Sequence, residues 1–233
     1  MFPMPSKSRA ENRAEQTRAI QQTARRHLAE VGPAALSLRA IAREVGLVSS
    51  AVYRYFPSRD DLLTALIVAA YDELGDAVEA ADSAVADRAD LAARFRALCH
   101  AIRDWARANP HEYALLYGSP VPGYAAPDDT VTPAVRVSGA FMALGQAAER
   151  AGRTPIATLP VSEAEKDAIA PIQDFLDDPI DDAHLLRWLM VWSAVFGHVS
   201  LELFGHMYRG VLDYDEHFSQ AVGQLATDLG LVT

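Results

Sequence analysis

The chain has 233 residues, half of them apolar and 22% charged, with a formal net charge of −10. This length and composition predict one or two folded globular domains and exclude an intrinsically disordered protein. A single cysteine, Cys99, excludes an internal disulfide and suits a reducing cytoplasm, and no apolar run typical of a secretion signal follows the N-terminus.

The charge is unevenly distributed along the chain. Residues 1–60 carry ten Lys or Arg and five Asp or Glu, whereas residues 61–233 carry eleven and twenty-six. The N-terminal part is therefore net positive, and we expect it to face a polyanion such as DNA, from which the acidic remainder is repelled.

The N-terminal residues predict a tail followed by a helix. Residues 1–10 contain two prolines and two serines and indicate a flexible tail, whose Lys7 and Arg9 either reach along DNA or remain solvated. Residues 11–30 predict a first helix, with Ile20, Ala24 and Leu28 facing inward. Gly32-Pro33 ends it.

A helix-turn-helix is predicted between Ser37 and Pro57. Ser37 is expected to cap a helix whose apolar stripe recurs at helical spacing: Leu38, Ile41, Ala42 and Val45. Gly46 fits the left-handed residue that ends a helix. A second short helix, from Ser49 to Phe56, is expected to enter the DNA major groove, and it must stop before Pro57.

The run Ile41-Ala42-x-x-Val45-Gly46, then Ala51-Val52-Tyr53-x-Tyr55-Phe56-Pro57-Ser58-Arg59-x-x-Leu62, resembles the DNA-binding domain of the tetracycline-repressor (TetR) family. The resemblance implies that the hydroxyls of Tyr53 and Tyr55 bind DNA phosphates; simple packing is the alternative. It also places Arg59 where the family often has a phosphate-gripping lysine. The family often has serine or threonine where Val48 stands, so Ser49 or Ser50 must cap the second helix.

Chemistry adds further candidates for DNA contact. Arg39 lies at the start of a predicted helix, where a phosphate can bind free amides and a guanidinium together. Arg54 can make a bidentate contact to guanine. The full set of candidate DNA-binding residues is Arg39, Ser49, Ser50, Ala51, Tyr53, Arg54, Tyr55 and Arg59.

From Ser58 to Arg153 the pattern remains helical. Ser58 is expected to cap a helix reaching about residue 75, and Leu91, Phe95, Leu98, Cys99, Ile102, Trp105 and Ala106 form one apolar stripe. A short helix is predicted at 111–117, an irregular loop rich in proline and glycine at 118–127, and a further helix at 132–151. Residues 153–182 are acidic and poorly periodic, and we expect a solvated face or a helix N-terminus there.

Two helices near the C-terminus indicate a homodimer. From Trp188 to Phe204 most residues are apolar on all sides, although the run is too short to span a membrane. We therefore expect segments 183–208 and 214–230 to pack on the protein's own interior and on a second subunit. Ser193 and Gly197 are small enough to let a partner helix approach closely.

The C-terminal part also resembles one branch of the family, sometimes named for a Trp-His-Gly signature. The resemblance rests on Pro110-His111-Glu112-Tyr113, Pro120-Val-Pro-Gly-Tyr124 and Trp192-x-x-Val-Phe-Gly197-His. It implies an all-α ligand-binding and dimerisation domain. Aromatic residues either line an apolar ligand pocket or form plain core: Trp105, Tyr113, Tyr117, Tyr124, Phe141, Trp192 and Phe196.

Other chemistry is weakly indicated. His198, Glu202 and His206 recur every fourth residue; two of them with an outside ligand would suit a metal, but buried hydrogen bonding is the preferred interpretation. No catalytic or nucleotide-binding motif is present, and Cys99 lies in an apolar stripe, so we expect no enzyme and no cofactor.

The sequence thus predicts an all-α protein. Its expected parts are a tail at 1–10, a three-helix helix-turn-helix domain at 11–60 and a larger helical domain at 61–233. The predicted function is that of a cytoplasmic, homodimeric transcriptional regulator that binds a palindromic operator in double-stranded DNA. A repressor released by a small apolar effector is favoured; the alternative is a helical ligand-binding or protein-interaction module without sequence-specific DNA binding.

Overall fold

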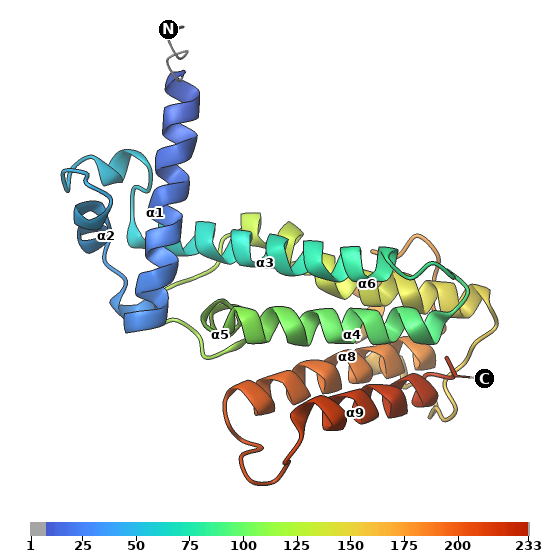
Figure 1. The fold of residues 1–233 in the computed structure, drawn as a ribbon. Helices are drawn as coiled ribbons and strands as arrows, with labels where there is room; N and C mark the ends of the chain where they lie inside the picture. Colours follow the sequence, from blue (N-terminus) through green and yellow to red (C-terminus); the bar gives the residue numbers. More distant parts are fainter. Residues whose placement is uncertain (1–7, 233) are drawn as a thin grey trace, which may run out of the picture. The chain divides into compact units, whose positions relative to one another are not determined.

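Residues 8–232, which the computed structural model describes, form α-helices and short 3₁₀ helices and no β-strand (Figure 1). The all-α prediction is therefore confirmed. The chain forms two compact units, one ending at Ala70 and including His111–Val131, the other comprising Tyr71–Pro110 and the residues from Thr132 onward. No described helix has the length and apolar character needed to cross a membrane.

The first unit is built around one apolar cluster. It contains α1 (Arg9–Val31), η1 (Pro33–Ala35), α2 (Leu38–Glu44), η2 (Val52–Arg54), the start of α3 (Arg59–Ser83), most of α5 (Pro110–Tyr117) and η3 (Asp128–Thr130). The buried residues of the cluster are Ile20, Ala24, Leu36, Leu38, Ile41, Ala42, Val52, Phe56, Leu62, Leu63 and Leu66. These apolar residues come from every helix of the predicted helix-turn-helix, and their burial holds its elements together.

The segment after α5 also belongs to this unit. Leu115, Val121 and Tyr124 pack against the apolar cluster, and the Tyr124 hydroxyl lies 2.9 Å from the Thr64 hydroxyl. The irregular loop predicted at 118–127 is confirmed, but it covers the N-terminal core. The sequence did not predict this contact, because the loop lies far along the chain from α1, α2 and α3.

Helix α1 begins earlier than expected. Ser8 accepts a hydrogen bond from the Glu11 amide (3.1 Å), and Glu11 accepts one from the Ser8 amide (2.6 Å), which completes a capping box. Arg9 and Ala10, expected in the tail, are therefore helical. Residues 1–7 of the predicted tail lie outside the described residues.

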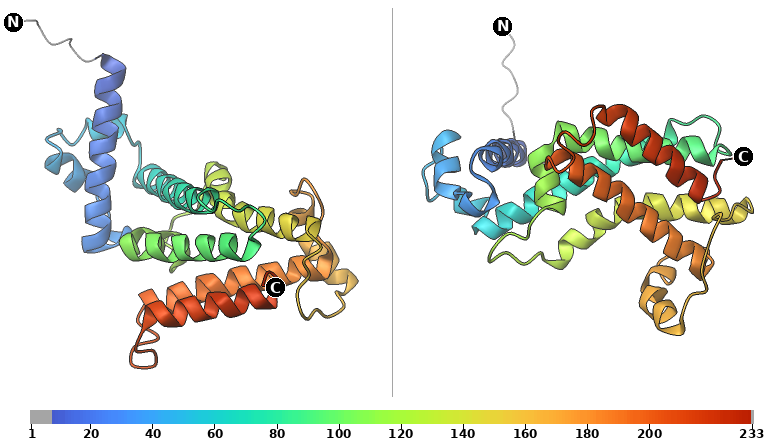
Figure 2. Two further views of the ribbon diagram at one scale, coloured as in Figure 1. Left: turned by 45° about the vertical axis from the view of Figure 1, so that its right-hand side comes forward. Right: turned by 90° about the horizontal axis from the view of Figure 1, so that it is seen from below.

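The second unit is organised around α4 (Leu91–Ala108). Its predicted apolar stripe is buried, and α8 (Asp182–Leu203) and α9 (Tyr214–Asp228) run beside it (Figures 1 and 2). Phe95 contacts Phe141 and Trp188 edge to face, with ring centroids 6.1 and 6.2 Å apart. These aromatic contacts join α4 to α6 (Val131–Arg150) and to α8.

The 153–182 segment holds a helix that the sequence analysis did not place, α7 (Glu163–Gln173), capped by Ser162. Asp181 caps α8 by accepting from the Ala183 and His184 amides, which confirms that an acidic run marks a helix N-terminus there. Helix α8 ends at Leu203, before the predicted boundary, because Gly205 adopts a left-handed φ of 77°.

Candidate nucleic-acid interface

The first helix of the helix-turn-helix has the predicted boundaries. Ser37 Oγ accepts a hydrogen bond from the Ala40 amide (3.4 Å), and α2 then runs from Leu38 to Glu44. Gly46 has a φ of 73°, and the Leu47 amide donates back to the Ala42 carbonyl over 2.8 Å. The predicted cap and glycine turn are both confirmed.

The recognition segment is shorter and tighter than the predicted Ser49–Phe56 helix. Its regular part is the 3₁₀ helix η2, with the Tyr55 amide bonded to the Val52 carbonyl over 2.9 Å. No side chain caps η2, so the prediction that Ser49 or Ser50 caps it is wrong. Val48 has no side-chain oxygen that could cap a helix, and Pro57 prevents a helix from continuing past Phe56. The stretch between them is short, and short helical stretches often adopt 3₁₀ geometry.

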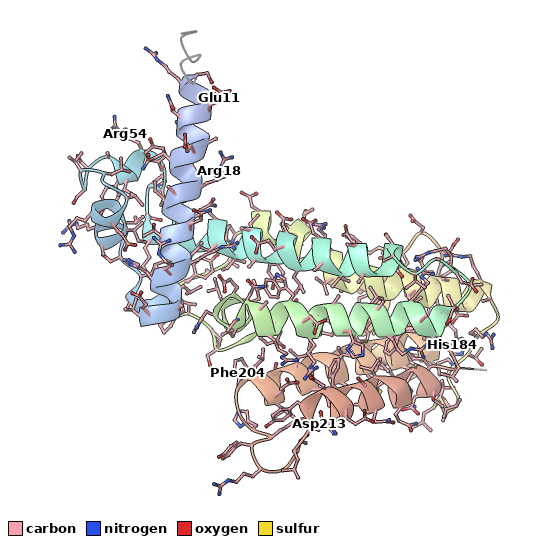
Figure 3. All side chains as sticks on the ribbon, in the orientation of Figure 1. Glu11, Arg18, Arg54, His184, Phe204 and Asp213 are labelled. Carbon is pink, nitrogen blue, oxygen red and sulfur yellow. The ribbon has the colours of Figure 1, made fainter. Side chains whose placement is uncertain are left out.

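The recognition segment has one buried side and one exposed side. Ala51 and Val52 are 5% and 0% exposed, whereas Tyr53 is 41% exposed and Ser49, Ser50 and Arg54 are also exposed. Figure 3 shows Arg54 pointing outward from this segment. Ala51, a candidate DNA-binding residue from sequence, is therefore buried beside Val52 and is not available for a contact to DNA.

Arg13 of α1 supports this segment, a role that the sequence did not reveal. Its guanidinium donates to the Arg54 carbonyl (3.3 Å) and lies 5.9 Å from the Tyr55 ring centroid. Tyr55 is half-buried against the apolar cluster. Tyr55 is therefore at least partly a packing residue, while its neighbour Arg54 is presented to solvent.

The two remaining candidates differ in how their guanidinium groups are used. Arg59 donates to the Pro33 carbonyl (2.8 Å) and pairs with Asp60 (3.3 Å), and its Nε is buried without a partner among the described residues. Arg59 therefore ties the start of α3 to η1. Arg39, the second residue of α2, is exposed and forms no ion pair with the described part of the chain.

Comparison with known proteins agrees with this geometry. Residues 20–66 match "Bacterial regulatory proteins, tetR family", and residues 95–225 match "Tetracyclin repressor-like, C-terminal domain". The HTH-type transcriptional regulators Rv1816 of Mycobacterium tuberculosis and Mb1846 of Mycobacterium bovis are each 44% identical over 188 residues, which is 80% of this chain and of theirs. The chain belongs to the tetR family.

Solved structures share this fold. The crystal structure of SCO4313 is 32% identical, with a TM-score of 0.78, over 95% of this chain and all of that one. A protein of unknown function from Rhodococcus sp. RHA1 is 25% identical, with a TM-score of 0.70, over 99% of this chain and all of that one. The tetR family consists of transcriptional regulators and not of enzymes; the Trp-His-Gly branch stays a prediction.

In this tetR-family chain the predicted aromatic ligand set is divided between the two units. Tyr113, Tyr117 and Tyr124 belong to the first unit, where Tyr113 is fully buried and its ring lies 5.2 Å from that of Tyr117. The second unit holds the other members of the set: Trp105, Phe141, Trp192 and Phe196.

Within the second unit, packing accounts for most of this set. Phe141 is fully buried against Phe95, and Trp105 is 8% exposed. Trp192 stacks at an angle on Phe196, with centroids 5.0 Å apart. The Trp192 indole N–H is buried and donates to no acceptor among the described residues.

Two of the three residues weighed as metal ligands, Glu202 and His198, have other partners. Glu202 accepts two hydrogen bonds from Arg103 (2.7 and 2.8 Å), and His198 Nδ1 lies 2.9 Å from the Ala194 carbonyl. His206 follows the end of α8, so the three residues do not lie on one helix. The described residues contain no group of three or more His, Cys, Asp or Glu placed to hold a metal ion.

Arg103 links α4 to both α8 and α9. Its side chain is 3% exposed and contacts Asp215 at 2.7 Å in addition to Glu202, and Arg107 contacts Asp215 at 2.9 Å. Burial alone lowers the pKa of Arg103, but its bonds to both carboxylates outweigh that effect and raise the pKa. Residue 103 falls outside the apolar stripe, and its partner is 99 residues away, so sequence reasoning missed it.

Proposed function

We propose that this chain is a sequence-specific DNA-binding transcriptional regulator that acts as a homodimer. The observation that carries the proposal is the division of the recognition segment into a buried side, Ala51 and Val52, and an exposed side, Tyr53 and Arg54. A segment whose buried side packs on the apolar cluster can present the side chains of its exposed side to the edges of base pairs in a major groove.

The proposed contacts separate into two kinds. Arg54 reads base edges, because its guanidinium can bond two acceptors of guanine, with Ser49 and Ser50 beside it. Arg39, Tyr53 and Tyr55 bind phosphates and set the position of the segment. Arg59 has fewer donors left for a phosphate, because it already donates to the Pro33 carbonyl and pairs with Asp60.

The dimer is proposed to form through α8 and α9. Met190 and Leu201 of α8 are 55% and 43% exposed although they are apolar, and Ser193 between them is also exposed. A Cβ built on Gly197 meets no atom within 4 Å, so the helix surface is open there. Such a stripe of apolar and small residues fits a second copy, and the two-fold symmetry implies a palindromic operator.

Repression with release by a small apolar effector is the favoured mode of action. An effector that binds the DNA-free conformation more tightly than the DNA-bound conformation lowers the affinity for the operator. The size of the decrease is set by the ratio of the effector's affinities for the two conformations. We place the protein in the cytoplasm, because the operator DNA that it is proposed to bind lies there.

Fluorescence anisotropy on DNA from just upstream of the chain's own gene tests the proposal. We expect tight binding that weakens steeply with salt and is much weaker on scrambled DNA of the same length. Equally weak binding to every upstream fragment and to scrambled DNA would instead favour the alternative, a helical interaction module without sequence-specific DNA binding.

A further inference from the structure

A concave groove in the second unit lies between α6 and the end of α7. Its volume is about 430 Å³, within the range of about 300–1,000 Å³ that is usual for small-molecule sites. One wall consists of Val135, Ser138, Gly139, Met142, Ala143 and Gln146 of α6, and the other of Pro171, Ile172, Phe175, Leu176 and Asp177. None of these residues belongs to the aromatic set predicted from sequence.

The wall that follows α7 is held in place by side-chain bonds to its backbone. Gln146 Nε2 donates to the Asp178 carbonyl over 2.7 Å. Gln173 donates to the Ile180 carbonyl and accepts from the Ile180 amide (3.2 Å). The groove is thus largely formed before any ligand enters, which lowers the conformational cost of binding.

The lining is apolar with few polar groups. Met142 lies buried in the lining, while Phe175 stands 79% exposed along the opposite wall. Gln146 uses its amide nitrogen for Asp178, and no described donor reaches its Oε1, so that oxygen can accept a bond from a ligand. An apolar body with one hydrogen-bond donor is the complement of this lining.

The charge of the groove excludes one class of ligand. No Lys or Arg lines it, and its one charged lining residue is Asp177. Arg150, one turn beyond Gln146 on α6, is paired with Asp178 at 2.7 Å. An anionic ligand would lose its hydration there without gaining a counter-charge.

We propose that this groove is the effector site, and that it takes a neutral or cationic apolar molecule rather than a carboxylate or phosphate. The inference rests on the proposed function for its regulatory meaning, but binding in the groove can be measured without DNA. It moves the effector site from the predicted aromatic set to α6 and α7.

Two fluorescent probes with one ring skeleton test the charge rule. N-phenylnaphthylamine is neutral, with one N–H donor, and anilinonaphthalene sulfonate adds an anionic sulfonate to the same rings. Both probes are titrated into the full-length protein. The neutral probe is expected to bind at least about tenfold more tightly, which corresponds to about 1.4 kcal/mol. Removing water from the unpaired sulfonate of the other probe costs more than this. Equal or tighter binding of the sulfonate would overturn the charge rule.

Variants in the groove test its location. Ala143→Phe adds a ring to the groove from an exposed helix position, and Gly139→Leu adds a side chain where a Cβ meets nothing within 4 Å. Both are expected to weaken neutral-probe binding about tenfold or more while leaving the thermal midpoint close to wild type. Ala108→Phe, at an exposed position of α4 outside the groove, is the matched control. Unchanged binding in both groove variants would overturn the location.

Operator anisotropy separates failure of this site from failure of the proposed function. If wild-type protein binds operator and the neutral probe releases it, Ala143→Phe should abolish release and retain DNA binding. If the probe binds the groove without affecting operator binding, the groove is a ligand site but its assignment as the effector site is wrong. If wild-type protein binds no operator, the DNA-binding proposal fails, and the probe titrations still decide the site.

Discussion

Arginines have different surroundings in the two units. The first unit exposes several that pair with no carboxylate of the described chain: Arg18, Arg39, Arg43 and Arg54. In the second unit several are bound to carboxylates of the same chain: Arg88, Arg94, Arg103, Arg107, Arg136 and Arg150.

The difference separates two uses of the same side chain. An arginine without an internal carboxylate keeps its donors available for phosphates and bases, and each neutralised phosphate contributes to affinity by releasing counterions. An arginine already bonded to carboxylates within the fold joins helices, and its removal leaves those carboxylates unpaired. The comparison predicts that substituting the ion-paired arginines of the second unit lowers stability. Substituting the exposed arginines of the first unit that have no carboxylate partner should instead weaken DNA binding.

The largest expected effect is on stability, at Arg103. Arg103→Ala leaves the partly buried Glu202 without the two hydrogen bonds that it accepts from Arg103, and should lower the free energy of unfolding by about 3–5 kcal/mol. Arg39→Ala should change it by no more than about 0.5 kcal/mol. Urea denaturation of both variants measures the difference; a loss below about 1 kcal/mol for Arg103→Ala would show that this cluster contributes little to holding α4, α8 and α9 together.

The next effect is on operator affinity, at Arg54. Arg54→Ala should weaken operator binding by about 1–3 kcal/mol, because a bidentate base contact is lost, and should leave the unfolding midpoint unchanged. Arg96→Ala, an exposed arginine of α4 with no ion pair in the described chain, is the control and should bind normally. If both variants lost the same operator affinity, the effect would come from the overall charge of the protein and not from a base contact of Arg54.

A smaller change is expected at Arg39, where the proposed contact is to a phosphate. Arg39→Ala should weaken binding to operator and scrambled DNA by a similar factor. It should also reduce the slope of log affinity against log salt by about 1. An unchanged slope would remove Arg39 from the interface.

The smallest effect concerns acid stability. Burial alone raises the pKa of Asp82, but hydrogen bonds from Arg94 and Arg88 outweigh it and hold that pKa below its ordinary value. The folded state therefore binds fewer protons here than the unfolded state. This contribution is present above the unfolded pKa, about 3.9, and is lost as pH falls through the folded pKa.

Asp82→Asn tests the sign of this effect. The variant should be less stable than wild type at pH 7, by about 1 kcal/mol, and the difference should shrink as the pH falls below about 4. Urea titrations at several pH values measure it. A difference that grows on acidification would show that the pKa of Asp82 is raised in the fold.

Much of this arrangement was predictable where the determining interactions are local. Ser37, Gly46 and Pro57 limit the helix-turn-helix within a few residues, and the α4 stripe repeats at helical spacing. Helix α7 was missed because only Ile169 in it is buried, so the apolar periodicity is weak. The Arg103–Glu202 contact joins residues far apart in sequence, which no local pattern reports.

The assignment of η2 as the recognition segment is tested most directly by selecting binding sites from random double-stranded DNA with wild-type protein and with Arg54→Ala. The account predicts that wild type enriches a palindrome, and that the variant enriches the same palindrome with relaxed preference at one guanine position in each half-site. If the variant retained every base preference of wild type, Arg54 would not read bases and the proposed recognition surface would be wrong.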